Sequence, residues 1–402
     1  MKYIVYGLEL VISTIIMYAL KPFWPKNIWI VSERADQAQD NGIAFFKYLC
    51  HEQKDVFPVY LLEKNSNKIG EVSKIGTVIQ KGSLKHKVYF LNAKVIATTE
   101  KNIIEPWGAN LFYSKLGWLY PKKIKVFLQH GIVDKDVSAV YGKSVSNFDM
   151  FIASTEAEKK FIVDKFGYDE DEVKVTGLAR YDYLWQQKDI VKKENIILYT
   201  PTWRRYLIDL ANQDTQYIEA CREKFKESLY FKSVQSVLES EVLQRILETH
   251  DFKLVFITHH AMNDFADLFE ANSPRVEIFK SEDVSIANWL LRAKVFITDY
   301  SSIHFDSGYI GNSNIYYQFD REEFKKQHAG ASYFTYEQDG FGMMVSKIEE
   351  LVEAVEQEIT QESYHKEMHG NRRETFFEHF DSLNCQRIYK EIKNRLDEEN
   401  GK

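Results

Sequence analysis

The chain has 402 residues. One hydrophobic core usually stops growing at about 250–300 residues, so we expect two domains. The 59 acidic and 52 basic side chains give a net charge of −7. This excludes an overall positive potential that would attract nucleic acid, so any anion-binding site must be a local group of residues. The three cysteines, Cys50, Cys221 and Cys385, are odd in number and widely spaced. They fit neither a disulfide framework nor a zinc site and indicate a reducing compartment.

Residues 3–20 are apolar apart from Glu9 and a few small or hydroxyl residues. Lys21, Trp24 and Lys26 follow, an aromatic and basic edge typical of headgroup depth. Three interpretations stay open: a helix lying on the inner leaflet or shallowly inserted, a buried helix of the domain, or a membrane span, which needs about 20 apolar residues. A secretory signal is disfavoured, because no small-residue cleavage site follows and the chain leads directly into a strand-like run.

Short β-rich runs alternate with helical stretches in the first half of the chain. The strand candidates are residues 28–33, 56–63, 77–83, 93–100, 124–130 and 150–154. A helix is expected to open at Asp40, and Thr155 with Glu158 resembles a capping box for a second helix that ends near Gly167. The polar stretch 185–195 has no strand character, and we interpret it as the interdomain linker.

The second half repeats this alternation, with strand candidates at 196–200, 254–260, 276–280, 295–299 and 314–319. The polar segment 205–251 carries one helical run at 233–250, and the charged tail 347–398 is helical. The pattern predicts an α/β fold of two Rossmann-like domains facing a central cleft. We expect an N-terminal segment at 1–27, one domain at 28–190 and a second domain, with the C-terminal helices, at 191–402.

Three polar clusters each follow a strand candidate directly: Gln129-His130-Gly131, Pro201-Thr202-Trp203-Arg204 and Thr298-Asp299-Tyr300-Ser301-Ser302. In an open α/β sheet, ligands bind outside the carboxyl ends of the strands, where loops and helix N-termini present backbone N–H groups. A histidine, an arginine and two serines at a helix start favour an anionic ligand. We therefore expect these clusters to line the binding cleft.

The clusters, together with the run Thr176–Asp182, the histidine that ends 254–260 and Asp306, resemble the catalytic region of the CDP-glycerol glycerophosphotransferases of wall teichoic acid synthesis. The resemblance covers roughly residues 28–345. It implies a GT-B fold, with the acceptor side at 28–190 and CDP-donor binding at 191–402. It also implies metal-independent transfer of an alditol phosphate from CDP-glycerol, with no cofactor, to a hydroxyl of a lipid-linked or polymeric glycan, releasing CMP. The enzyme would be a peripheral protein on the cytoplasmic face of the membrane, in teichoic acid or capsule synthesis.

His130 is the expected general base. An acceptor hydroxyl must attack the β-phosphorus while CMP leaves, and an imidazole, whose ordinary pKa is about 6.5, removes a proton efficiently near neutral pH. Gly131 would permit close backbone approach. The alternative is a histidine that only caps the end of a strand.

Ser301 and Ser302 precede the helical stretch 303–311, an arrangement in which free N–H groups and the helix dipole bind phosphate. Alternatively, Ser301 is only a helix cap. Asp306 shares a helix face with Ser302 and is expected to orient a donor hydroxyl or a cationic side chain. Arg204, and less so Arg205, is expected to neutralise the diphosphate as CMP departs. The expected donor-binding set is completed by Thr202, Thr298 and Asp299.

The resemblance places one donor-binding, catalytic histidine after the strand 254–258. His259 is chosen by position, with His260 as the alternative. Trp203 is interpreted as a packing residue rather than a platform for the base. Arg180 and Asp182 are further candidates for the site, or else form a structural ion pair at the domain edge.

Several functional alternatives stay open. His304 stands where the family usually has an apolar residue, which weakens the assignment of the alditol, so a CDP-ribitol donor is an alternative. A priming, polymerising or capsule-modifying role is equally compatible. The rival classes are a nucleotide-sugar glycosyltransferase of GT-B architecture and a non-catalytic binding protein, against which the presence of His130, Arg204 and Ser302 argues.

Overall fold

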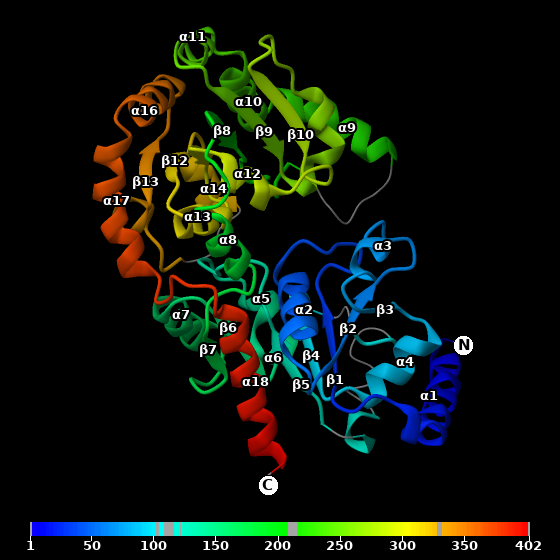
Figure 1. The fold of residues 1–402 in the computed structure, drawn as a ribbon. Helices are drawn as coiled ribbons and strands as arrows, with labels where there is room; N and C mark the ends of the chain where they lie inside the picture. The colour runs from blue at the N-terminus through cyan, green and yellow to red at the C-terminus, as the bar shows by residue number, and fades with distance from the viewer. Residues whose placement is uncertain are drawn as a thin grey trace. The chain divides into compact units, whose positions relative to one another are not determined.

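The structure is a computed structural model that describes residues 2–101, 104–107, 116–120, 122–207, 215–327 and 332–400. The chain divides into two compact α/β units, many of whose elements are labelled in Figure 1. Unit 1 comprises Met1–Ile132, Val137–Tyr183 and Asp381–Lys402, and unit 2 comprises Val133–Asp136 and Leu184–Phe380.

Unit 1 is built on a seven-stranded parallel sheet with the order β3-β2-β1-β4-β5-β6-β7. Its strands are β1 (Ile28–Ser32), β2 (Phe57–Leu62), β3 (Thr77–Gln80), β4 (Val95–Thr98), β5 (Ile124–Phe127), β6 (Met150–Ala153) and β7 (Val173–Val175). This is the doubly wound order, in which the direction of strand addition reverses between β1 and β4. Strands β1, β4 and β6 are buried along their whole length, as expected where helices cover both faces of a parallel sheet.

The helices of unit 1 are α1 (Lys2–Ala19), α2 (Asn41–Glu52), α3 (Ile69–Val72), α4 (Leu84–Asn92), α5 (Ser138–Tyr141), α6 (Lys143–Ser146), α7 (Glu156–Phe166) and α18 (Asn384–Asn400), with short 3₁₀ turns η1 (Lys21–Phe23) and η3 (Gly117–Leu119). The predicted start and end of α7 are confirmed. The Thr155 hydroxyl accepts a hydrogen bond from the Glu158 backbone N–H at 3.0 Å, and Gly167 ends the helix with a φ of 74°. The Glu158 carboxylate accepts from the Ser154 N–H rather than completing the capping box at Thr155.

Unit 2 has a six-stranded parallel sheet with the order β10-β9-β8-β11-β12-β13 and its reversal between β8 and β11. The strands are β8 (Ile196–Tyr199), β9 (Lys253–Thr258), β10 (Val276–Lys280), β11 (Val295–Thr298), β12 (Ser313–Tyr317) and β13 (Gly342–Val345). The helices are α9 (Thr215–Glu227), α10 (Leu229–Glu239), α11 (Glu241–Thr249), η4 (His260–Leu268), α12 (Ile286–Arg292), α13 (Ile303–Tyr309), α14 (Arg321–Gln327), α15 (Tyr336–Asp339), α16 (Ile348–Thr360) and α17 (Glu362–Phe376). Helix α8 (Tyr181–Gln187) crosses the boundary between the units.

Two local expectations for unit 2 differ from the structure. The predicted helical run at 233–250 is two helices, because Ser240 ends α10 and its hydroxyl accepts a hydrogen bond from the Leu243 N–H to cap α11. Helix α9 and strand β13 were not expected. Strand β13 is short and only its first residue is buried, so its sequence carries a weak strand pattern.

The ranges of the units also differ from the expected domains. The last helix, α18, was assigned to the second domain, but it packs in unit 1, where Ile388 and Ile392 are fully buried with Trp29 of β1. An amphipathic helix must bury its apolar stripe, yet the stripe itself does not specify which core receives it. The start of the expected linker, 185–195, is part of helix α8, and residues 184–190 belong to unit 2.

The N-terminal residues form α1 and η1 of unit 1 rather than a separate segment. Figure 1 shows α1 beside α4, and the Glu9 carboxylate pairs with the Lys87 ammonium at 2.7 Å. Leu10 and Met17 are buried in a hydrophobic cluster that also contains residues of α4 and of the sheet. Among the residues that the structure describes, no helix has the length and apolar character to cross a bilayer.

Candidate functional site

The second and third polar clusters meet at the reversal point of the unit 2 sheet. They follow β8 and β11, which are neighbours. The Thr202 backbone N–H donates to Asp299 Oδ1 at 2.8 Å, and the Thr298 hydroxyl donates to the Thr200 carbonyl at 2.8 Å. This is the position at which open α/β sheets bind ligands. Both clusters follow strands, as predicted, and the structure brings these two together.

Arg204 lies inside unit 2 rather than on its surface. Its side chain has no exposed area. The guanidinium donates from Nε to Asp320 Oδ2 at 2.6 Å and from Nη2 to Asp320 Oδ1 at 2.9 Å, and Nη2 lies 2.8 Å from Asp299 Oδ2. Four aromatic rings surround it at 5.0–5.2 Å, those of Tyr230, Tyr300, Phe319 and Phe324.

This placement corrects the expectation that Arg204 meets the diphosphate directly. The guanidinium is covered, and two carboxylates already match its charge. Thr298 and Asp299 were expected to bind the donor, but they are also buried, with 0% and 1% of their surface exposed. The polar groups of Asp299 hold the loop itself, because Oδ1 accepts from the Tyr300 N–H at 2.6 Å as well as from Thr202.

Ser301 and Ser302 are half-buried at the start of α13. The Ser301 hydroxyl accepts a weak hydrogen bond from the Ile303 N–H at 3.4 Å, so a capping role is present. Ser302 occupies the N-cap position without a capping hydrogen bond from its side chain. Asp306 lies one turn further along the helix and is only 4% exposed, which does not favour contact with a ligand hydroxyl.

His259 is half-buried at the end of β9, next to β8, and His260 is exposed. His259 Nδ1 accepts a hydrogen bond from the Ala261 N–H at 3.2 Å. The neutral ring therefore carries its proton on Nε2, which makes that nitrogen a donor. The ring stacks on Trp203, with centroids 6.3 Å apart. Trp203 also packs against the core of unit 2, as predicted for a packing residue.

In unit 1, the backbone of the first cluster is held in an unusual conformation. Gln129 is fully buried with a φ of 59°, which is rare for a residue other than glycine. Its side-chain Nε2 donates to the Ile152 carbonyl and to Glu158 Oε1, and its backbone carbonyl accepts from Asn41 Nδ2 at 2.8 Å. The sharp turn leaves the next residue, His130, exposed, whereas Gly131 is buried.

The run Thr176–Asp182 connects this turn to other elements of unit 1. Arg180 Nη1 donates to Asp40 Oδ1 at 2.7 Å and to the His130 carbonyl at 3.0 Å. Asp182 accepts from the backbone N–H groups of Asn384 and Cys385 at 2.8 and 2.9 Å and so caps α18. Both residues therefore have a structural role, Arg180 through Asp40 and Asp182 through the start of α18.

Glu33 was not anticipated by the sequence analysis. It follows β1 directly and is 2% exposed. Its carboxylate accepts from the backbone N–H groups of Gln39, Asp40 and Ile43, at distances between 2.6 and 3.2 Å. Burial, with the nearby Asp40 charge, raises its pKa to about 7. Rossmann-like units bind phosphate at the N-terminus of the first helix, and in unit 1 a carboxylate of the protein occupies that position.

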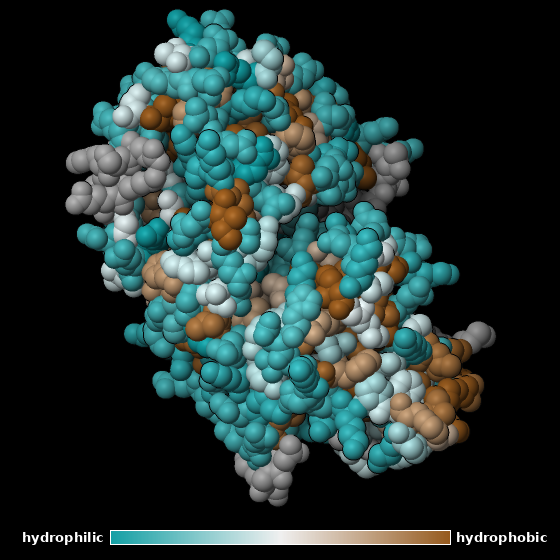
Figure 2. Space-filling view, in the orientation of Figure 1, coloured by the Kyte–Doolittle hydropathy of each residue, from teal (hydrophilic) through white to brown (hydrophobic). Residues whose placement is uncertain are grey.

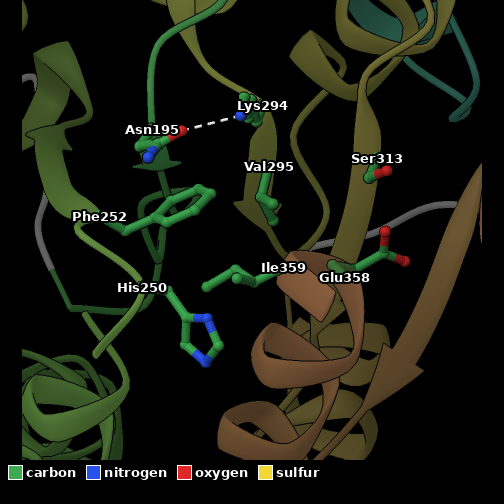
Figure 3. Close-up of a pocket in the computed structure, with 8 residues that line it drawn as sticks. All are labelled: Asn195, His250, Phe252, Lys294, Val295, Ser313, Glu358 and Ile359. Carbon is green, nitrogen blue, oxygen red and sulfur yellow. Dashed lines mark hydrogen bonds between the residues drawn. The ribbon is translucent and has the colours of Figure 1, made fainter. Parts of the chain in front are cut away.

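A pocket of about 180 Å³ lies at the amino ends of strands in the unit 2 sheet (Figure 3). Asn195, Lys294 and Ser313, which line it, come from the amino ends of β8, β11 and β12. Lys294 Nζ donates to Asn195 Oδ1 at 2.8 Å. Because the polar clusters follow the carboxyl ends of the strands, this pocket is separate from the candidate site. No cluster that could hold a metal ion occurs in the part of the chain that the structure describes.

Two doubly wound parallel sheets in one chain define a GT-B fold, as expected. The structure is similar to that of the wall teichoic acid polymerase TagF, with a TM-score of 0.67 at 15% identity, covering 94% of this chain and 90% of that one.

Residues 13–394 match the family model described as CDP-glycerol:poly(glycerophosphate) glycerophosphotransferase. The chain belongs to this family, which confirms the resemblance of its motifs. It is 27% identical to the minor teichoic acid biosynthesis protein GgaB of Bacillus subtilis over 91% of this chain but only 40% of that protein. It is 22% identical to a teichoic acid glycerol-phosphate transferase of Staphylococcus aureus, over 90% of this chain and 92% of that protein.

Proposed function

We propose that this chain transfers glycerol phosphate from CDP-glycerol to a hydroxyl of a lipid-linked or polymeric glycan, in teichoic acid or capsule synthesis, and releases CMP. The observation that carries the proposal is the family match over residues 13–394, because it spans both units and includes all three polar clusters. The reaction requires no resident metal or cofactor in this proposal.

Unit 2 binds the donor in this proposal. Thr202, Ser301 and Ser302 contribute hydroxyl groups from the loops at the reversal point of its sheet, and His259 contributes its imidazole from the end of the neighbouring strand β9. The placement of Glu33 supports the choice of unit 2, since its carboxyl group already accepts the backbone N–H groups at the equivalent position of unit 1. A phosphate at that position would find these N–H groups occupied.

His130 acts as the general base in this proposal. It accepts the proton of the acceptor hydroxyl while the new bond forms between that oxygen and the β-phosphorus, and the bond between the β-phosphorus and the CMP oxygen breaks. The buried Gln129 turn and the Arg180 contact with the His130 carbonyl fix the backbone from which the imidazole projects. Such positioning reduces the entropy lost when the reacting groups meet.

A donor panel tests the proposal. The purified chain is incubated with CDP-glycerol, CDP-ribitol, UDP-N-acetylglucosamine or GDP-mannose and a poly(glycerol phosphate) primer, and nucleotide release is measured. Calorimetric titration of each donor gives binding independently of the acceptor. CMP release and binding with CDP-glycerol alone support the proposal. Preference for CDP-ribitol favours the ribitol alternative, preference for a nucleotide sugar favours a glycosyltransferase, and binding of none contradicts the proposal.

The proposal also includes peripheral attachment to the cytoplasmic face of the membrane through α1 and η1. Apolar side chains gather over α1 and η1 in Figure 2, and those at least half exposed are Tyr3, Ile4, Leu8, Val11, Ile12, Ile15, Tyr18 and Phe23. A contiguous apolar surface of this kind is uncommon on soluble monomers and is typical of interaction sites. Lys21 and Lys26 follow α1 in the sequence and are exposed, which favours a surface of anionic lipids.

A further inference from the structure

Three loops of unit 2 converge on Arg204. One is its own loop after β8, to which it is tied because Nη1 donates to the Thr202 carbonyl. The second follows β11 and contributes Asp299. The third follows β12 and contributes Asp320, which binds two guanidinium nitrogens and is itself fully buried at its side chain. A single buried cation therefore joins the carboxyl ends of three strands.

Further contacts fix Tyr300 within this cluster. Its hydroxyl donates to Asp320 Oδ1 at 3.4 Å, and its ring stacks on Phe324 with centroids 3.7 Å apart. Its carbonyl accepts from Lys135 Nζ at 3.0 Å, and its N–H donates to Asp299. Tyr300 immediately precedes Ser301 and Ser302, so few backbone rotations separate the fixed residue from the two serines.

Stability alone is a poor explanation for such a cluster. Moving charges out of water is unfavourable, and buried ion pairs are often no more stable than apolar side chains of similar volume. A planar guanidinium does, however, impose geometry, because its donors are arranged in a rigid fork. Polar clusters of this kind specify one arrangement of the groups they join.

We propose that Arg204 and Asp320 are positioning residues that hold Thr202 and the Ser301–Ser302 turn in the arrangement that binds the donor diphosphate. This inference rests on the proposed function of unit 2. Neither side chain touches the donor. They act through Asp299, whose Oδ1 accepts from Thr202 and Tyr300 and thereby sets the spacing of the two donor-binding loops.

The test uses two conservative variants of the full chain, Arg204→Lys and Asp320→Asn. Arg204→Lys keeps the charge but removes the fork, and Asp320→Asn keeps the shape but removes the bidentate acceptor. Matched controls are Arg292→Lys and Glu194→Gln, since these two residues form a bidentate pair at 2.6 and 3.0 Å at the amino end of the unit 2 sheet. Hydrogen exchange of 200–206 and 299–303, urea unfolding, and the KM and kcat for CDP-glycerol are measured for all four.

For Arg204→Lys and Asp320→Asn we expect amide exchange in both loops to be at least about tenfold faster, with a donor KM raised by at least about tenfold and a smaller change in kcat. The controls should match the unaltered chain. A purely structural role would instead lower the folded fraction, so that kcat falls at an unchanged KM, and this result would overturn the proposal. Failure of both variants to fold would overturn it too. If the unaltered chain does not use CDP-glycerol, the proposed function fails, and unchanged loop exchange in the variants would separately refute the positioning role.

Discussion

Asp182 and Asn384 are 202 positions apart in the sequence, yet Asp182 Oδ1 accepts hydrogen bonds from both the backbone N–H and the side-chain Nδ2 of Asn384, each at 2.8 Å. Asp182 Oδ2 accepts from the next N–H, that of Cys385. The carboxylate thus caps helix α18 from a distant part of the chain. This contact joins the C-terminal helix to the N-terminal unit, in addition to the burial of Ile388 and Ile392 in its core.

Asp182→Ala should destabilise unit 1 by about 2–3 kcal/mol, because it removes a charged cap that accepts three hydrogen bonds and leaves the N–H groups of α18 without their acceptor. Urea unfolding followed by circular dichroism gives this free energy. The control is Asp189→Ala, whose carboxylate is mostly exposed beside Lys188 and should change stability by less than about 0.5 kcal/mol. Equal effects of the two substitutions would contradict the capping role.

Gly177→Ala should be much more damaging than Gly82→Ala. Both glycines have positive φ values, 79° and 76°, so each alanine introduces backbone strain of about 1–2 kcal/mol. At position 177 the new Cβ would also lie 1.9 Å from Asn384 Oδ1, whereas position 82 has open space. We expect a further loss of at least about 2 kcal/mol at position 177, since Asn384 must leave its partners. Comparable unfolding free energies for the two variants would show that α18 adapts without cost.

His130→Ala should reduce CMP release by about 10²–10⁴-fold while CDP-glycerol binding, measured by calorimetry, changes only a few-fold. The reason is that the proposed base acts on the acceptor hydroxyl and not on the donor. His51→Ala is a suitable control, because that histidine is also exposed in unit 1 but lies in the last turn of α2. Turnover near that of the unaltered chain would remove His130 from the mechanism.

His304→Phe should change the pH dependence of stability. His304 is fully buried among aromatic rings, and its Nδ1 lies 3.1 Å from the Tyr316 hydroxyl. Burial lowers the pKa of His304 well below its usual 6.5. As the pH falls below 6.5, the unfolded chain gains a proton that the folded chain does not, so the unaltered protein loses stability.

The loss should reach at most about 1.4 kcal/mol per pH unit relative to the phenylalanine variant, until the pH falls to the folded-state pKa. Urea unfolding at pH 7, 6 and 5 measures the difference between the two proteins, which cancels the carboxylates they share. A difference that is constant over this range would mean that His304 protonates as readily in the folded state as in the unfolded one.

Replacing Leu8, Ile12 and Ile15 together by glutamate should abolish co-sedimentation with anionic lipid vesicles. These side chains are 51–62% exposed and share one face of α1, while Leu10 and Met17 stay in place to anchor the helix to the core. Ile190→Glu, at a 73% exposed position in unit 2, serves as the control. If the triple variant still sediments with vesicles, a different surface attaches the protein to lipid.

The sequence by itself determined the fold class and the position of the polar clusters along it. Strand and helix periodicity, the Thr155 cap and the polar residues after β5, β8 and β11 are all set by neighbouring residues, so short segments reveal them. The family motifs are local in the same sense. For this reason His130, Ser301 and Ser302 were recognised as candidates, and the structure places each at a strand end or helix start with surface exposed.

Only the tertiary structure decided which polar residues face the solvent and which lie inside. Arg204 pairs with Asp320 over 116 positions, and the cap from Asp182 to Asn384 is still more distant. Neither pairing can be predicted from local composition, because the sequence around an arginine that follows a strand is the same whether the arginine binds a ligand or a carboxylate. Burial and charge pairing depend on residues that approach only when the chain folds. The buried contacts of Arg204 with Asp299 and Asp320, and the burial of the Glu33 carboxyl group, could therefore be found only from the tertiary structure.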